Sequence, residues 1–454
     1  MSFVKKILAA TKNAHFQSLL GNGVVALFGL LITAILYRVL SKTDISIYLS
    51  FLVYFGLVDT LRSGFLTFAF IKFYSGAKVD KANEITGSTW FLSLVITGGL
   101  VVLNVVVVLM FSSHITDGAV IFFLKYFSWM FLAGLPFFMA SLVVQGDKRF
   151  DRLLWLRFVN QILFTVLVIA LVVLGKATLD TVLLAYIASN LAASLVAVFC
   201  GWTMIGTIKY VKKNAIAELF HFGKYSFGTN LSATLFRVTD VFFINLYLGP
   251  VALAVYFLGG RLVQIIEIPL GSFVSSGMPS LSEYYNNGEK KHMMLLMKKM
   301  IGMVSIAFFI IAIFSVIFAD PMIMLIGGAK YIHSEAPNLF RIFMCVAILY
   351  PTDRFFAVTL DVIHKPKINF YKILIMLTMN LIGDYVGVTV FKSVYGVVFA
   401  NVFTISAAIL IAYVPINKYS KFNFWNMYII GYRESVLLIK QTYQTMFGAN
   451  VNKI

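Results

Sequence analysis

The sequence predicts an all-α polytopic membrane protein with about twelve transmembrane helices. Three observations support this fold class. Of the 454 residues, 60% are hydrophobic and only 12% are charged, whereas soluble proteins have about 25% charged residues. The apolar segments are about 20 residues long, which suits helices that cross a bilayer and not the shorter alternating segments of an outer-membrane barrel. Along the chain, loops rich in basic residues also alternate with loops that contain few of them.

The first apolar segment is expected to be an uncleaved helix. Lys5, Lys6 and Lys12 precede a run that continues to Val39 without a small-residue cleavage site, unlike a signal peptide. A polar, partly amphipathic tail follows the last span. The predicted spans are 18–39, 47–71, 89–111, 119–144, 153–174, 179–205, 224–248, 251–275, 300–325, 338–361, 368–390 and 394–416.

The charges of the loops predict the orientation. One side of the predicted membrane has only Arg38, Lys42, Lys176, Lys330 and Lys392, while most of the 37 basic residues lie on the other. The positive-inside rule places the basic side, with both termini, in the cytoplasm. The formal net charge of +18 is therefore interpreted as a signal of topology and of a lipid surface. No basic motif with interleaved aromatic residues is present, and no nucleic-acid partner is predicted.

A faint internal repeat predicts two lobes. Leu40 and Tyr48 flank seven residues at the first turn, and Leu248 and Tyr256 do so between the seventh and eighth spans. Six spans per unit would make the halves parallel repeats; the alternative is that turn chemistry recurs by chance. The expected domains are an N-terminal six-helix lobe (1–208), a cytoplasmic linker (209–223), a C-terminal six-helix lobe (224–416) and a cytoplasmic tail (417–454).

Ionisable residues inside the predicted spans indicate a polar cavity, because a charge at mid-membrane costs at least about 2.5–3.5 kcal/mol. Asp59 with Arg62, and Arg237 with Asp240, are three residues apart on one helical face. Each pair either neutralises itself to fix helix packing or contributes to function.

Other buried charges lack such a neighbour. Arg261 has no acidic residue one turn away and lies some 14 Å deep by helical rise, so it is the best candidate to face an anionic ligand. Lys125 lies near a span end, where it either binds substrate or extends outward to the interface. Glu267 and Asp384 are either proton or sodium sites or partners of an arginine on a neighbouring helix. Arg354 follows Asp353 and Pro351 in the tenth span.

Several kinds of chemistry are not expected. The six histidines lie in loops or at span ends, and Cys200 and Cys345 are interpreted as small apolar fillers. Phosphate-binding loops, zinc motifs and nucleophile elbows are missing. The sequence therefore predicts no catalytic residue, no metal, no cofactor and no enzymatic activity.

Several motifs resemble a known family. The run Gly223–Gly228, then Arg237–Asp240, Leu248–Pro250 and Pro279–Ser282, resembles the polysaccharide transport family of O-antigen-type oligosaccharide flippases, in the multidrug/oligosaccharidyl-lipid/polysaccharide exporter superfamily. Residues 351–354, Asp361, Lys365-Pro366 and 380–384 are similar to the C-terminal half of that family. The resemblance covers essentially the whole chain.

The resemblance implies two six-helix lobes around a central cavity. It implies that the protein flips undecaprenyl-pyrophosphate-linked oligosaccharide, an O-antigen or exopolysaccharide repeat unit, across a bacterial inner membrane by alternating access. The expected partners are this lipid-linked oligosaccharide, membrane lipids, a coupling H+ or Na+ and polysaccharide polymerase machinery. The candidate substrate-binding residues are Arg62, Arg237, Arg261, Arg354 and Lys125. The candidate ion-coupling residues are Asp59, Asp240, Glu267 and Asp384.

Two other functions are weighed. A cation-coupled multidrug exporter of the same superfamily would have an acidic, aromatic cavity, and the basic residues disfavour it. A membrane-embedded transferase of cell-envelope sugars would need a catalytic His or Asp with acceptor-binding loops, and the short outer loops disfavour it. Lipid II flippases usually have two further helices, so the peptidoglycan precursor is the less favoured substrate.

Overall fold

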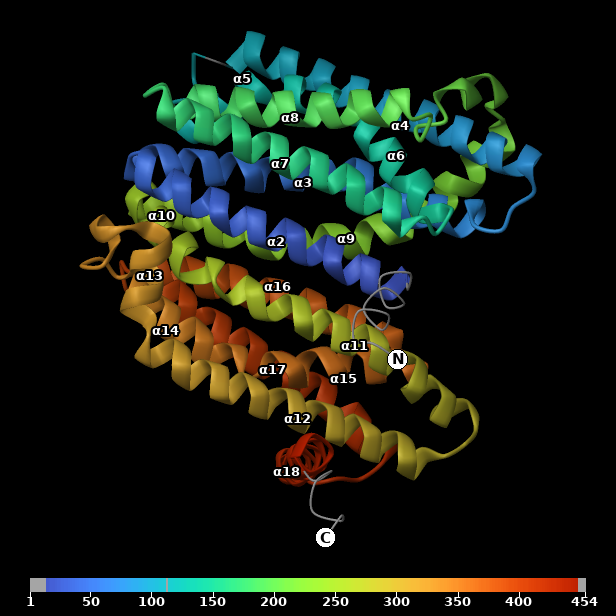
Figure 1. The fold of residues 1–454 in the computed structure, drawn as a ribbon, viewed down its shortest axis with the longest axis vertical. Coiled ribbons are helices and arrows are strands. Elements are labelled where there is room, and N and C mark those ends of the chain that lie inside the picture. The colour runs from blue at the N-terminus through green and yellow to red at the C-terminus, as the bar shows by residue number, and fades with distance from the viewer. Residues whose placement is uncertain (1–13, 112, 448–454) are drawn as a thin grey trace. The chain divides into compact units, whose positions relative to one another are not determined.

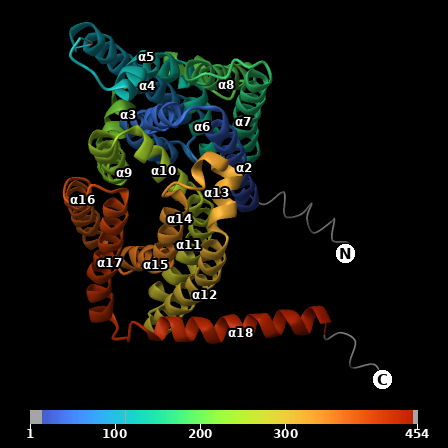
Figure 2. The same ribbon diagram turned by 90° about the vertical axis from the view of Figure 1, so that its left-hand side faces the viewer.

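The computed structural model describes residues 14–111 and 113–447. A few side chains within these ranges are not described. Every regular element among the described residues is a helix (Figures 1 and 2). The helices are α2 (Ala14–Val39), α3 (Lys42–Tyr74), α4 (Val79–Phe111), α5 (Gly118–Ala133), α6 (Leu135–Gly146), α7 (Phe150–Val173), α8 (Leu179–Phe199), η1 (Ile205–Tyr210), α9 (Lys213–Leu248), α10 (Pro250–Arg261), α11 (Val263–Asn286), α12 (Lys290–Ile317), α13 (Ala319–Gly327), η2 (Ala329–Tyr331), α14 (Ala336–Ala347), α15 (Tyr350–Val362), α16 (Pro366–Thr389), α17 (Val394–Tyr419) and α18 (Asn426–Phe447).

The predicted fold class is confirmed. Each of the twelve predicted spans is covered by one helix or by two successive helices. Among the described residues, eight helical stretches are long and apolar enough to cross a membrane, or nine if α5 and α6, bent by 46°, form one span. The chain is therefore a multi-pass membrane protein. The bend between α5 and α6 lies at Gly134, just before Pro136, which occupies the first turn of α6.

Local sequence explains where several helices begin and end. The Ser41 hydroxyl accepts a hydrogen bond from the Asp44 N–H at the start of α3, and Asp117 caps α5 in the same way. Such side chains satisfy N–H groups that have no partner inside a helix. Between α9 and α10, Gly249 has φ 84°, a value that glycine adopts without a Cβ clash. The predicted turn Leu248-Gly249-Pro250 is thus a sharp helix–helix corner.

The chain divides into two compact units. The first contains α2 to α9, the start of α10 to Ala254, and residues 326–328; the second contains the remaining described residues from Val255 onward. In the first unit, α3 packs along α9 and α2 packs along α7. Its core includes Trp90, whose indole N–H donates to the Thr203 carbonyl at 2.8 Å. The six-helix lobes expected from the sequence repeat stay a prediction.

In the second unit, α16 packs along α17 and α12 packs against α18. Glycines bring both pairs of backbones together. A Cβ on Gly387 of α16 would lie 2.7 Å from the Gly396 carbonyl carbon of α17. Helix α18 crosses α12 instead of running beside it, since α18 is seen end-on in Figure 1 and lengthwise in Figure 2.

Candidate functional site

The first candidate site is the ion pair inside α3. Arg62 is almost fully buried, with 3% of the residue exposed, and its Nη2 lies 2.7 Å from Asp59 Oδ1. The two residues are one helical turn apart, as the sequence predicts. The Asp59 side chain keeps 26% of its surface exposed. The pair therefore combines an enclosed cation with a carboxylate that remains partly accessible at the protein surface.

Neighbouring helices hold the Arg62 guanidinium in place. Its Nη1 donates to the Phe131 carbonyl at 3.4 Å and to the Thr97 hydroxyl at 3.5 Å. Its Cζ lies 4.0 Å from the ring centroid of Phe131 and 4.6 Å from that of Phe138. Aromatic faces attract a cation at such distances. Arg62 thus links α3 to α4, α5 and α6.

Lys125 lies at an exposed position near the start of α5. Its Nζ lies 2.7 Å from Asp180 Oδ1 at the start of α8, and more than half of each side chain is exposed. The Tyr126 hydroxyl donates to the same carboxylate oxygen. Lys125 is thus an exposed residue paired with Asp180, and both interpretations of its role stay predictions.

The second predicted intrahelical pair lies in α9. Asp240 is buried. It belongs to the first unit, where α9 packs along α3. The Arg237 side chain lies outside the described residues, and so does its predicted pairing with Asp240. Arg237 lies in α9, and its role as a substrate ligand stays a prediction.

Three further candidates lie in the second unit. Arg261 is the last residue of α10, and its Nη1 donates across the break into α11, to Gln264 Oε1 at 2.7 Å. Arg261 is partly exposed, and Glu267 and Arg354 are exposed. A planar guanidinium can bind two oxygen atoms of a phosphate or carboxylate at once.

A second buried ion pair was not expected. Lys372 of α16 has 2% of its residue surface exposed, and its Nζ lies 2.7 Å from Asp353 Oδ1 of α15. Lys372 lies inside α16, which begins at Pro366, and inside the predicted span 368–390. The residue next to Asp353 in sequence is the basic Arg354. The carboxylate instead pairs with a lysine nineteen positions away.

Asp384 is fully buried in α16. The amide of Asn380, one turn earlier and also fully buried, donates to Asp384 Oδ2 at 2.8 Å. The spacing i, i+4 could have revealed this contact, because such residues are neighbours on a helix. Asp384 therefore lies beside an amide in the same unit as the Lys372–Asp353 pair.

Metal binding is not indicated by the described part of the chain. Nowhere within 14–111 and 113–447 do three or more His, Cys, Asp or Glu side chains gather as a metal ion would require. The chemistry available is that of fixed charges, carboxylates and arginines inside or near membrane-spanning helices.

These features define a class of protein, namely polytopic membrane proteins with ionisable residues inside their helices. Comparison with known families identifies the family. A model of the polysaccharide biosynthesis protein family matches residues 11–285, which is more than half of the chain, so the protein belongs to that family. A second model, MatE, matches residues 226–386. No curated protein matches the chain.

Solved structures share the fold. An inward-facing multidrug resistance MATE family transporter of the MOP superfamily is 14% identical, with a TM-score of 0.71 over 92% of this chain and 96% of the other. A MOP superfamily transporter from Pyrococcus furiosus is 14% identical (TM-score 0.63; 90% and 95% covered). The lipid II flippase MurJ in an inward closed conformation is 13% identical (TM-score 0.64; 94% and 98% covered). These likenesses show a shared fold, and the family resemblance found in the sequence is confirmed by the match to the polysaccharide biosynthesis family.

Proposed function

We propose that this protein is a flippase that moves undecaprenyl-pyrophosphate-linked oligosaccharide across a bacterial inner membrane. The observation that carries the proposal is the match of residues 11–285 to the polysaccharide biosynthesis family. The shared fold of the lipid II flippase MurJ supports lipid-linked cargo. The protein acts by alternating access between two six-helix lobes, 1–208 and 224–416, with both termini in the cytoplasm. It needs no cofactor and catalyses no covalent step.

Arg261 and Arg354 are the side chains best placed to bind the pyrophosphate and anionic sugars. Both reach the protein surface, at least in part. A guanidinium forms two parallel hydrogen bonds with phosphate oxygens, which a lysine cannot do. Arg62, in contrast, is enclosed by Asp59 and two aromatic rings, so it acts on the conformation more than on the cargo.

Asp59 is the coupling site that the geometry favours. A proton that binds the partly exposed Asp59 carboxylate cancels its charge and leaves the Arg62 guanidinium without its counter-ion in an enclosed site. The contacts that join α3 to α4, α5 and α6 are then weakened. Release of the proton restores the pair. Asp240, Glu267 and Asp384 stay alternative coupling sites.

The test is transbilayer movement of a lipid-linked oligosaccharide in proteoliposomes. Wild type is compared with Arg261→Ala, Arg354→Ala and the control Arg149→Ala, which removes an exposed pair with Asp151 at the start of α7. We expect the first two variants to lose at least tenfold in rate, or about 1.4 kcal/mol, and the control to keep it. Folded wild type that moves no such lipid would overturn the proposal.

A multidrug exporter is the second candidate, favoured by the MatE match over residues 226–386 and by the MATE transporter fold. The same vesicles distinguish the two functions. Exchange of organic cations for protons or sodium, without movement of lipid-linked sugar, would establish the exporter. The exposed arginines predict the opposite result, because they repel cations.

A further inference from the structure

Helix α18, in the polar tail, is held tightly against α12 at a pair of glycines. A Cβ on Gly302 would lie 2.2 Å from the Met427 carbonyl oxygen, and a Cβ on Gly431 would lie 2.2 Å from the Gly302 carbonyl carbon. Any larger side chain would force the helices apart. The two backbones are thus in direct contact where the helices cross.

Polar contacts fix α18 on both sides of this crossing. Lys299 Nζ of α12 lies 2.7 Å from Glu434 Oε1, and the hydroxyls of Thr352 in α15 and Tyr428 are 2.9 Å apart. Met427 is fully buried beneath the helix. The start of α18 is therefore an integral part of the second unit.

The crossing lies at the level where α12 changes from basic to apolar. Lys290, Lys291, Lys298 and Lys299 occupy the first part of α12, and the sequence is apolar from Met300 to Ile317. Gly302 is three residues beyond Lys299, or about 4.5 Å along the axis. In a membrane, this level is the boundary between lipid headgroups and acyl chains.

The outward face of α18 carries side chains that suit this boundary. Trp425 in the turn just before α18, and Ile429 and Tyr432 within it, are 68%, 51% and 63% exposed. Arg433 and Lys440 are exposed beside them. Tryptophan and tyrosine are enriched at membrane interfaces, and helices that lie in the interface combine such an apolar face with basic residues.

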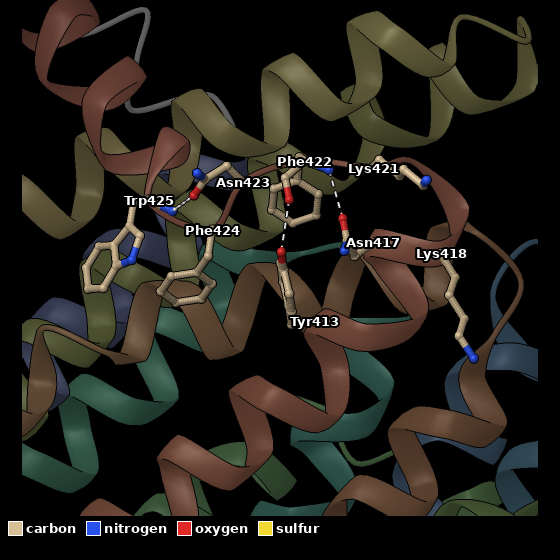
Figure 3. Close-up of a pocket in the computed structure, with 8 residues that line it drawn as sticks. All are labelled: Tyr413, Asn417, Lys418, Lys421, Phe422, Asn423, Phe424 and Trp425. Atoms are coloured by element: carbon tan, nitrogen blue, oxygen red, sulfur yellow. Dashed lines mark hydrogen bonds between the residues drawn. The ribbon is translucent and has the colours of Figure 1, made fainter.

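The junction of α17 and α18 forms an open pocket of about 700 Å³ (Figure 3), lined by Tyr413, Asn417, Lys418, Lys421, Phe422, Asn423, Phe424 and Trp425. Hydrogen bonds shape it: the Tyr413 hydroxyl donates to the Phe422 carbonyl, and the Phe422 N–H donates to Asn417 Oδ1. Figure 3 shows the ammonium groups of both lysines away from the Phe424 and Trp425 rings. One end of the pocket is therefore basic and the other aromatic.

We propose that α18 lies in the plane of the membrane and that this pocket binds the headgroups of anionic phospholipids. Charge supports this partner: residues 417–454 contain Lys418, Lys421, Arg433, Lys440 and Lys453 but only one acidic residue, Glu434. Basic residues beside a membrane attract anionic lipid. The proposal is independent of the cargo and concerns the surface of the cytoplasmic leaflet.

The depth of α18 is measured by spin labels in nanodiscs, on full-length protein in which Cys200 and Cys345 are replaced by alanine. Labels are placed at Ile429→Cys and Tyr432→Cys, and at Asn287→Cys as an aqueous control in the loop between α11 and α12. We expect the α18 labels to contact oxygen more than a water-soluble nickel reagent, and the control to show the reverse. Equal exposure of all three to the nickel reagent would overturn the in-plane position.

Lipid selectivity is measured by native mass spectrometry of protein released from mixed phosphatidylglycerol and phosphatidylcholine membranes. The double variant Lys418→Gln/Lys421→Gln is compared with wild type and with Lys176→Gln/Lys392→Gln, from the predicted outer side. We expect retained phosphatidylglycerol to fall about fivefold for each lysine removed from the pocket, with no fall in the control. Equal retention in both double variants would refute the headgroup site. In the spin-label experiment, magnetic coupling between the Ile429→Cys labels of two chains would instead show that a second copy of the protein covers this face.

Discussion

At the scale of residues, the two buried ion pairs have the same construction. In each, a nearly inaccessible cation, Arg62 or Lys372, meets a carboxylate that stays partly exposed, Asp59 or Asp353. A buried charge without its partner is strongly destabilising, whereas removal of both charges is often tolerated. The pairs therefore couple the charge state of an accessible carboxylate to helix packing.

Asp59→Ala tests this argument in the first unit. We expect a lower melting temperature in detergent, because loss of one partner of a buried pair costs about 3–5 kcal/mol. The double variant Asp59→Ala/Arg62→Met should recover much of the loss. Lys125→Met, which removes an exposed pair with Asp180, is the control and should shift stability by no more than about 1 kcal/mol. A double variant as unstable as the single one would contradict the role of the pair.

The second pair makes a separate prediction. Lys372→Met should lower the melting temperature, and Lys372→Met/Asp353→Leu should restore part of it, because both buried charges are then gone. Arg354→Met changes the residue next to Asp353 in sequence but removes an exposed side chain. It should leave the melting temperature near that of wild type. A larger effect of Arg354→Met than of Lys372→Met would show that Asp353 depends on its sequence neighbour.

At the scale of helices, close glycine contacts and helix breaks shape the second unit. Gly387 and Gly396 let α16 and α17 touch, and Gly302 and Gly431 do the same for α12 and α18. Small residues at such crossings allow tight van der Waals packing in a membrane. The break between α10 and α11 leaves Arg261 at a helix end, where its side chain bonds Gln264.

Gly387→Ala is expected to destabilise the protein, because the added Cβ would lie 2.7 Å from the Gly396 carbonyl carbon and force α16 and α17 apart. Gly98→Ala in α4 is the matched control, since a Cβ there has no neighbour within 4 Å. Alanine favours a helix over glycine by about 1 kcal/mol, so the control should be neutral or stabilising. Thermal unfolding in detergent distinguishes them, and equal shifts would show that the crossing tolerates a larger separation.

Much of the helical framework was predictable from the sequence. Each span predicted from hydropathy coincides with one helix or two successive helices, because the lipid interior selects long apolar runs, and Gly249 and Pro250 marked the break after α9. The tertiary pairings were not predictable. Lys372 meets Asp353 only because α15 and α16 pack together, and no local pattern indicates that α18 crosses α12. Arg62 was identified correctly as buried, but its aromatic contacts come from helices far away in the sequence.

At the scale of the whole molecule, the charges of the loops predict the orientation in the membrane. The basic side, with both termini, is predicted to be cytoplasmic, and Lys330 of η2 is predicted to lie on the outer side. In the proposed function, the short predicted outer loops leave binding of the cargo to the helices. The proposed direction of transport therefore depends on the predicted orientation in the membrane.

Cysteine labelling checks that orientation in intact cells, again with Cys200 and Cys345 replaced. We expect Lys330→Cys to react with an impermeant maleimide from outside, because it lies in a predicted outer loop. Lys213→Cys, at the start of α9, should react only after the cells are opened. The reverse pattern would place the termini outside and reverse the proposed direction of flipping.

The contact between Gly302 and Gly431 also has a consequence for bilayer thickness. If α18 rests at the headgroup boundary, α12 has only the residues from Gly302 to Ile317 to traverse the apolar layer before α13 begins. Fifteen helical steps cover about 22 Å, which is shorter than a typical hydrocarbon core of about 30 Å. The predicted span 300–325 therefore needs α13 to complete the crossing, and if α13 lies outside the hydrocarbon layer, the bilayer is expected to thin locally at this side of the protein.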